Sequence, residues 1–159
     1  MIAAVALPLL RAAGHEVAAP GRQELDLFDA AAVRDAVAGF DAVIHLATRV
    51  GQRDENDRIR SEGSRNLVDG ALAGGAQVYV QPTITFLQLD GVRAAERETA
   101  RFAASGGRGV VLRFGLLYGP GTGNDGPDHT YGSTLHVDAA GRAVVAALEL
   151  PSGTYAYED

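Results

Sequence analysis

The alternation of helix and strand is clearest over residues 25–48, whose sequence is LDLFDAAAVRDAVAGFDAVIHLAT. Asp29 is a residue type that caps helix N-termini, and Val33 and Val37 lie four residues apart, as on one face of a helix. We therefore predict a helix that begins after Asp29 and ends near residue 38. The apolar run AVIHL (42–46) follows after a short turn and is typical of a buried strand.

The same alternation continues on both sides of this stretch. Further helices are predicted over residues 2–13, 57–73, 92–104 and 138–150, the last one capped by Asp138. Further strands are predicted over residues 16–19, 25–27, 77–80, 110–114 and 154–157, and a loop over residues 119–132. Single helices between short strands indicate right-handed βαβ units and a mostly parallel sheet. The predicted class is thus α/β, with one domain over residues 1–159 because no linker or repeat interrupts the pattern.

Composition excludes several classes of protein. The chain has 159 residues, no cysteine and a net charge of −6. Phosphate-rich surfaces attract basic proteins, so this charge disfavours nucleic-acid and anionic-membrane binding. Every Lys/Arg position is an arginine, which excludes mechanisms that need a lysine amine, as the missing thiols exclude disulfides and thiolate metal sites.

Targeting signals are not evident in the sequence. No stretch reaches the roughly 18 apolar residues of a membrane span. Arg11 follows the N-terminal apolar run, whereas a signal peptide carries its charge before such a run. We expect a soluble cytoplasmic protein that acts on a small molecule.

Five segments carry a resemblance to a known family. They are LLRAAGHEV (9–17), the stretch 25–48 with its HLA tripeptide, EGSRNLVDGALAGGAQVYVQ (62–81), VVLRFGLLYGPG (110–121) and STLHVDAAGRAVVAAL (133–148). In this order they resemble the NAD-dependent epimerase/dehydratase family of the extended and atypical short-chain dehydrogenases/reductases. The resemblance implies a Rossmann-like doubly wound sheet, NADP or NAD as cofactor, and hydride transfer on a sugar nucleotide or another small carbonyl or alcohol substrate.

The first departure from the family concerns the nucleotide fingerprint. The family has a strand and a G-x-x-G-x-x-G loop directly before its first helix, where backbone amides hold the pyrophosphate. This chain begins at that helix, and Gly14 and Gly21 do not form the motif. We therefore expect an N-terminally truncated domain, with residues 119–159 as the remnant of a substrate lobe. The strands on either side of the missing one are expected to pair with each other or with a second chain, which favours a homodimer.

The second departure concerns the catalytic pair. The family's Tyr-x-x-x-Lys would fall near residues 87–99, LQLDGVRAAERET, which contain neither residue type. The active-site serine of the family aligns with Thr83, a candidate hydroxyl donor, and the asparagine of its helix aligns with Arg60. We therefore expect this chain to be impaired or inactive as an enzyme.

Other site residues also follow from the resemblance. The adenine side would be contacted by Asp26 and Leu27, and Arg22 would favour the 2′-phosphate of NADP. Leu46, Ala47 and Thr48, at the end of a strand, would line the dinucleotide. Tyr118, Gly119 and Pro120 would form the loop over nicotinamide and substrate, with Pro120 on the cofactor and Tyr118 and Gly119 on the substrate. Three of these residues also have a purely structural explanation. Asp26 would belong to a turn, Arg22 would be a solvated surface residue, and Leu46 would pack in the core.

Two other classes of function remain open from the sequence. A non-catalytic dinucleotide sensor or a protein-interaction module would use the same fold without turnover. A hydrolase is disfavoured because no G-x-S-x-G motif follows a strand. His45, within an apolar strand, is expected to be a core histidine, and no His, Asp or Glu cluster has the spacing of a metal site.

Overall fold

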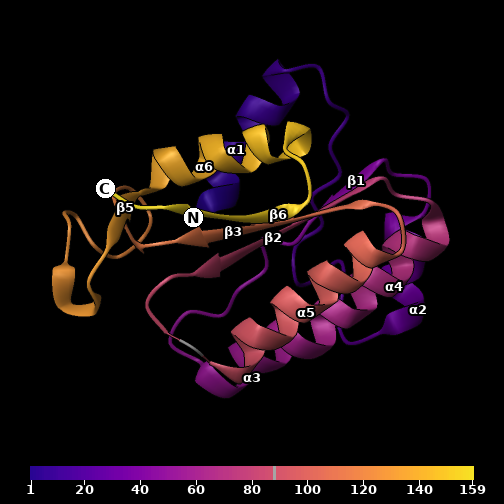
Figure 1. Cartoon of the computed structure of the whole chain (residues 1–159), viewed down its shortest axis with the longest axis horizontal. Helices are drawn as coiled ribbons and strands as arrows, with labels where there is room; N and C mark the ends of the chain where they lie inside the picture. Colours follow the sequence, from indigo (N-terminus) through magenta and orange to yellow (C-terminus); the bar gives the residue numbers. More distant parts are fainter. Residues whose placement is uncertain (88) are drawn as a thin grey trace.

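A four-stranded parallel sheet forms the centre of the molecule (Figure 1). The computed structural model describes residues 1–87 and 89–159. The strand order is β1 (Ala42–Ile44), β2 (Val78–Ile84), β3 (Arg108–Phe114), β6 (Gly153–Tyr157), and every neighbouring pair is parallel. Parallel strands are buried on both faces, which explains the runs of valine, leucine and tyrosine in β2 and β3.

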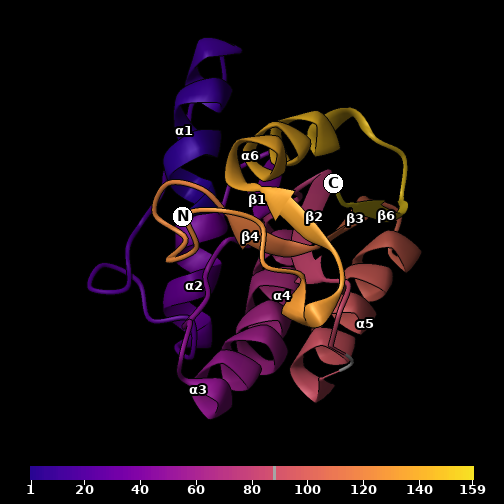
Figure 2. The ribbon, with the colours of Figure 1, turned by 90° about the vertical axis from the view of Figure 1, so that its left-hand side faces the viewer.

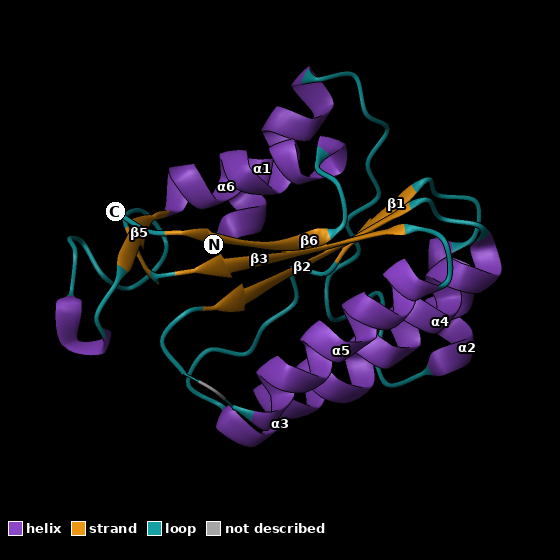
Figure 3. Ribbon diagram, in the orientation of Figure 1, coloured by secondary structure: helices purple, strands orange, loops and turns teal. Residues whose placement is uncertain are grey.

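Helices cover both faces of this sheet (Figures 1 and 3). One face carries α1 (Ile2–Ala12) and α6 (Val137–Ala146), which pack against each other. The other face carries α2 (Ala30–Val37), α4 (Ser64–Gly74) and α5 (Asp90–Ala104). A continuous helical stretch leads into α4 through α3 (Arg53–Arg58) and the π-helix η1 (Ile59–Gly63). The result is the doubly wound, three-layer arrangement that the sequence predicted.

Two apolar clusters fill the space between the layers. Leu10 of α1 packs with Val80, Leu112 and Val144 in the cluster under α1 and α6. Val33, Val68, Tyr79 and Phe102 belong to the cluster under α2, α4 and α5. These side chains are apolar and almost fully buried, so the two clusters supply most of the hydrophobic stabilisation of the fold.

A second, two-stranded sheet lies beyond the carboxyl end of β3. It pairs β4 (Leu116–Tyr118) with β5 (Thr134–His136). Neither strand was predicted from the sequence, and the two flank residues 119–132, which were predicted as a loop. Two short 3-10 helices, η2 (His129–Tyr131) and η3 (Ala147–Glu149), were also not predicted. Figure 2 looks onto the carboxyl ends of the strands, with β5 and the N-terminus in front.

Several sequence predictions are wrong. Residues 16–19 and 25–27 form no strand, so among the described residues neither pairs with β1; pairing of that edge with a second chain stays a prediction. Over residues 21–28 the chain instead makes turns: the amides of Glu24 and Leu25 both donate to the carbonyl of Gly21. The backbone groups of a strand need hydrogen-bond partners on a neighbouring strand. Several backbone groups of residues 21–28 find their partners within these turns instead.

The N-cap of α6 also differs from the prediction. His136, not Asp138, is the capping residue, since its Nδ1 accepts from the amide of Asp138 at 3.2 Å. Asp138 lies in the first turn of the helix, where a carboxylate interacts favourably with the helix dipole. Asp29 does cap α2, as predicted, by accepting from the amide of Ala32 at 3.0 Å.

Candidate functional site

A cavity of about 280 Å³ lies at the carboxyl ends of the central strands. Its walls come from the ends of β1, β2 and β3, the first turn of α1, the π-helix and the loop after β4. The lining residues are 1–3, 45–48, 50, 60, 81–84, 86, 114–117, 122 and 124. In open α/β sheets, ligands bind beyond the carboxyl ends of the strands, so this is the expected place for a ligand.

The cavity exists because β2 extends beyond β1. Only Val78–Val80 of β2 have partners on β1, whereas pairing with β3 continues to Ile84. The carbonyl of Val80 accepts from the amide of His45 on the β1 side. Pro82, two residues further, has its missing N–H on that same side, where no strand requires a donor. The proline is thus tolerated in a central strand, and it lines the cavity.

Four polar side chains form a buried network beside the cavity. The carbonyl oxygen Oε1 of Gln81 accepts from the hydroxyls of Ser64 and Tyr79, each at 3.0 Å, and lies 3.1 Å from His45 Nδ1. The second ring nitrogen of His45, Nε2, is buried and has no hydrogen-bond partner among the described residues. His45 and Gln81 both line the cavity. A ligand with a suitably placed donor would satisfy Nε2 when the ring is neutral.

Burial keeps this network uncharged at neutral pH. The pKa of His45 is lowered to about 4, first by desolvation and further by the positive charge of Arg60, although the contact with Gln81 opposes the shift. Desolvation also raises the pKa of Tyr79. The imidazole is therefore neutral at pH 7. Its 3% exposure confirms the predicted burial, whereas the expected full hydrogen bonding of a core histidine is not met, since Nε2 has no partner among the described residues.

Thr83 contributes a second polar cluster. Its hydroxyl donates to Glu96 Oε1 at 3.0 Å, and Arg113 donates to both oxygens of the same carboxylate, at 2.9 and 2.7 Å. The Arg113 guanidinium lowers the pKa of Glu96, and the Thr83 hydroxyl lowers it further. Glu96 lies on α5, the helix where the resemblance would place the tyrosine and lysine. In this arrangement the Thr83 proton is directed to Glu96.

The structure brings four of the predicted site residues together. Leu46, Ala47, Thr48 and Thr83 all line the cavity. Thr48 is held by Asn56, whose side-chain oxygen accepts from the Thr48 hydroxyl at 2.9 Å and thereby ties the loop after β1 to α3.

The three residues predicted on the adenine side do not line the cavity. Arg22 pairs with Glu55 at 2.9 Å, and Asp26 accepts from the amide of Phe28 at 2.9 Å in a local turn. The carbonyl of Leu27 accepts from the side chain of Asn66 at 2.8 Å. The hydrogen bond from the Phe28 amide thus supports the structural explanation of Asp26 as a turn residue.

The three residues predicted over the nicotinamide also lie outside the lining. Tyr118 packs edge-on against His136 with ring centroids 5.1 Å apart. Gly119 has φ +104°, and a Cβ there would lie 2.7 Å from His136 Nε2, so the tight approach requires glycine. Pro120 is exposed. From the same loop, Thr122 and Asn124 do reach the cavity.

The sequence reasoning missed some of the lining. Gln81, Phe86, Thr122 and Asn124 were not predicted. A detectable signal existed for Gln81, because it is a polar residue within the otherwise mostly apolar strand β2, and a buried polar side chain is informative. No comparable signal marks Thr122 or Asn124, whose positions depend on the path of the loop.

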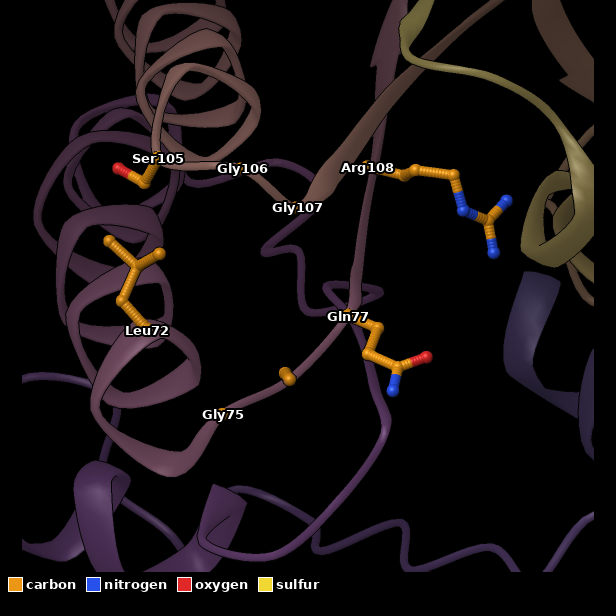
Figure 4. Close-up of a pocket in the computed structure, with 8 residues that line it drawn as sticks. Leu72, Gly75, Gln77, Ser105, Gly106, Gly107 and Arg108 are labelled. Carbon is orange, nitrogen blue, oxygen red and sulfur yellow. The ribbon is translucent and has the colours of Figure 1, made fainter.

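A second hollow lies at the opposite, amino-terminal end of β2 and β3 (Figure 4). It is lined by turns that contain Gly75, Gly106 and Gly107. Its one charged side chain, Arg108, extends away from the hollow in Figure 4 and donates to the carbonyls of Leu148 and Leu150, each at 2.8 Å. With its arginine turned away and bound to two carbonyls, this hollow offers Gln77 and Ser105 as its remaining polar side chains.

The described residues contain neither a group of metal-binding side chains nor a membrane-spanning helix. Within residues 1–87 and 89–159, no three His, Asp or Glu side chains lie close enough to hold a metal ion. Over the same residues, no helix is both long and apolar enough to cross a membrane.

Comparison with known proteins gives one relative of similar sequence. No protein-family model matches the chain. The chain is 33% identical to a 3-diazoavenalumate denitrifying reductase from Streptomyces sp., a match over 201 residues that covers 88% of this chain and 66% of the relative. The chain thus spans slightly under two thirds of that relative. Because the match is longer than the 159 residues of this chain, the relative contains residues within it that this chain lacks.

Solved structures agree more closely in fold than in sequence. MoeE5 in complex with UDP-glucose and NAD superposes with a TM-score of 0.80 at 20% identity, covering 99% of this chain and 72% of MoeE5. A UDP-glucose 4-epimerase of Thermus thermophilus in complex with NAD gives 0.77 at 17%, covering 99% and 74%. A UDP-N-acetylglucosamine 4-epimerase of Bacillus cereus gives 0.77 at 18%, covering 100% and 75%. The chain is therefore a Rossmann-like α/β protein with the fold of the NAD-dependent epimerases and dehydratases, and the resemblance stated from its sequence is confirmed in that fold.

Proposed function

We propose that the cavity beyond β1, β2 and β3 binds the nicotinamide end of NAD or NADP, and that the protein is an oxidoreductase or epimerase-type enzyme for a small carbonyl or alcohol substrate. The observation that carries the proposal is the meeting of the strand ends with the first turn of α1 at one cavity. Two of the similar structures are complexes with NAD, and the relative of similar sequence is a reductase.

The residues that line the cavity fit one half of such a dinucleotide cofactor. The volume of about 280 Å³ lies near the lower limit of small-molecule sites, roughly 300–1,000 Å³, so the enclosed space suits one half of a dinucleotide. The backbone at the start of α1 would face the phosphates, since the first amides of a helix have no partners within it. The unpartnered Nε2 of His45 would accept a hydrogen bond from the bound molecule. The cofactor, when bound, would supply or accept the hydride.

The chain's own residues have separate proposed roles. The strand-end residues Leu46, Ala47 and Thr48 would contact the nicotinamide half. Asp26 and Leu27 would contact the adenine half outside the enclosed space, and Arg22 the 2′-phosphate of NADP. That last contact competes with the ion pair between Arg22 and Glu55. Loop residues 118–120, which lie outside the cavity lining, would move to close over the bound cofactor and substrate.

An enzyme of this kind needs a group that transfers a proton to or from the substrate. None of the tyrosines lines the cavity within the described residues, and Thr83, the one aligned hydroxyl, already donates to Glu96. This observation favours a second candidate, a non-catalytic sensor of the dinucleotide. Its distinguishing property is cofactor binding without turnover.

A titration with NADPH and NADH tests both candidates. The chain has no tryptophan, so the fluorescence of the reduced cofactor can be followed directly. Saturable binding in the micromolar range is expected, weakened in Ala47→Leu, which places a larger side chain at the cavity wall. Ala31→Leu, on the exposed side of α2, is the matched control. No binding at millimolar cofactor would contradict the proposal, and a substrate screen on a binding-competent chain separates the enzyme from the sensor.

A further inference from the structure

Arg60 is a charged side chain of the cavity to which the proposed function assigns no role. It lies in the π-helix η1 and lines the cavity. Eight arginines make no ion pair or side-chain hydrogen bond to the described residues, and Arg60 is the one among them that is not exposed. The other seven are Arg11, Arg34, Arg53, Arg65, Arg93, Arg97 and Arg142. A partly buried guanidinium without a partner carries a desolvation cost that a bound anion would offset.

The backbone around Arg60 is specialised. π-helical turns are rare and occur frequently at functional sites. Here the amide of Ser64 bonds to the carbonyl of Ile59, five residues back, and the Ser61 hydroxyl donates to the carbonyl of Asp57 at 2.8 Å. The inserted residue changes the direction in which successive side chains leave the helix. The turn therefore provides a local reason why an arginine on this helix lies at the cavity.

The electrostatic surroundings favour an anion. No aspartate or glutamate lines the cavity within the described residues, although the chain as a whole carries a charge of −6. Asp57 is close enough to raise the pKa of Arg60, but the two side chains form no ion pair, and burial lowers that pKa more strongly. His45, the other titratable side chain beside Arg60, is neutral at pH 7. Among the described residues, Arg60 thus carries a positive charge that Asp57 offsets only in part and that no ion pair neutralises.

The remaining walls are mostly apolar. Leu46, Ile84, Phe86, Phe114 and Leu117 line the same cavity as Arg60. Such walls suit a ring or a short hydrocarbon body, beside the polar side chains of Thr48, Thr122 and Asn124 that line the same cavity. A guanidinium presents its donors in a planar fork that matches the two oxygens of a carboxylate.

We propose that Arg60 binds the carboxylate of a small organic acid whose apolar, ring-sized body contacts the aliphatic and aromatic walls of the cavity. This inference rests on the proposed function, since it names the substrate class of the same site. It assigns to Arg60 the role of a specificity residue, in the place where the resembling family has an asparagine.

Binding of three probes of equal ring size tests the inference. Benzoate, benzamide and phenyl phosphate are titrated into the ¹⁵N-labelled chain without cofactor, and the amide shifts of residues 45–48 give the dissociation constants. Benzoate is expected to bind more tightly than benzamide. Arg60→Gln should weaken benzoate binding by about ten- to hundredfold, because a charge-assisted hydrogen bond is lost. Arg60→Lys should recover only part of it, since the planar fork is missing.

The controls separate this inference from the proposed function. Arg65→Gln removes an exposed, unpaired arginine one turn further along and should leave benzoate binding unchanged. Equal binding of benzoate and benzamide, or unchanged benzoate binding in Arg60→Gln, would overturn the inference. Tighter binding of phenyl phosphate than of benzoate, lost in Arg60→Gln, would also overturn it by assigning Arg60 to a phosphate. The NADPH titration is independent of these probes, so cofactor binding without carboxylate preference would remove the substrate class alone.

Discussion

At the scale of single residues, the neutral imidazole of His45 links the cavity to the stability of the fold. Its pKa is about 4 in the folded chain and about 6.5 in an unfolded one. Between these values the unfolded chain binds a proton that the folded chain does not, so stability falls as the pH drops from 6.5 towards 4. Complete titration would cost about 3 kcal/mol at the lower limit of this window.

Urea unfolding at pH 7.5 and pH 5 measures this effect. The wild type should lose stability between the two values, and His45→Gln should lose markedly less because the titrating group is gone. His15→Gln, which changes an exposed histidine, should keep the wild-type dependence. Equal pH dependence in His45→Gln and the wild type would contradict the assigned protonation state.

The contact between Thr83 and Glu96 gives a second prediction at this scale. Thr83→Val keeps the side-chain shape but removes a hydrogen bond to a carboxylate, so it should lower the free energy of unfolding by about 1–2 kcal/mol. Combined with Glu96→Gln, the two changes should couple by about 0.5–1.5 kcal/mol in a double-mutant cycle. Thr83→Ser, which keeps the hydroxyl, is the control for Thr83→Val. Strict additivity would show that the hydroxyl does not depend on Glu96.

At the scale of elements, α1 and α6 are held at a close crossing by Gly141. A Cβ at this position would lie 2.6 Å from Val5 Cβ, so an added methyl group requires the two helices to separate. Gly141→Ala should therefore lower the free energy of unfolding by about 1–3 kcal/mol, despite the better helix propensity of alanine. Thermal unfolding measures the change. Gly126→Ala, whose Cβ would meet nothing within 4 Å, should be neutral, and equal effects of the two changes would contradict the close crossing.

Elements with strong local signals were predictable from the sequence. The Asp29 cap, the 3.6-residue spacing in α2 and the apolar run of β3 all depend on neighbouring residues, and the structure contains them. Residues 16–19 have strand-like composition, but a strand also requires a partner. β4 and β5 have only three residues each and pair across an intervening loop, so no local pattern marks them.

The residues of the candidate site also fall into those that the sequence predicted and those that it did not. Leu46, Ala47, Thr48 and Thr83 were predicted through the family resemblance, which matches them to positions of the family's motifs, and all four line the cavity. The network of His45, Ser64, Tyr79 and Gln81 joins two strands and a helix, so no single window of sequence contains it. Arg60 reaches the cavity from a π-helix, which a regular helical pattern does not indicate.

At the scale of the whole molecule, the two hollows lie at opposite ends of the sheet. The one beyond the carboxyl ends combines apolar walls with a buried ring nitrogen and a guanidinium that have no hydrogen-bond or ion-pair partner within residues 1–87 and 89–159. The one at the amino ends consists of glycine turns and an arginine that is already bound to carbonyls. The proposed ligand site is therefore the first hollow.

Mapping of NADPH onto the ¹⁵N-labelled chain tests this claim most directly. The account predicts that saturating NADPH shifts the amides of Ala3, residues 46–48, and residues 83, 84 and 86, all at the carboxyl-end cavity. The amides of Gly75, Gly106 and Gly107 should stay unchanged and serve as the internal control. Shifts confined to those three glycines, or no shifts at millimolar NADPH, would contradict the account.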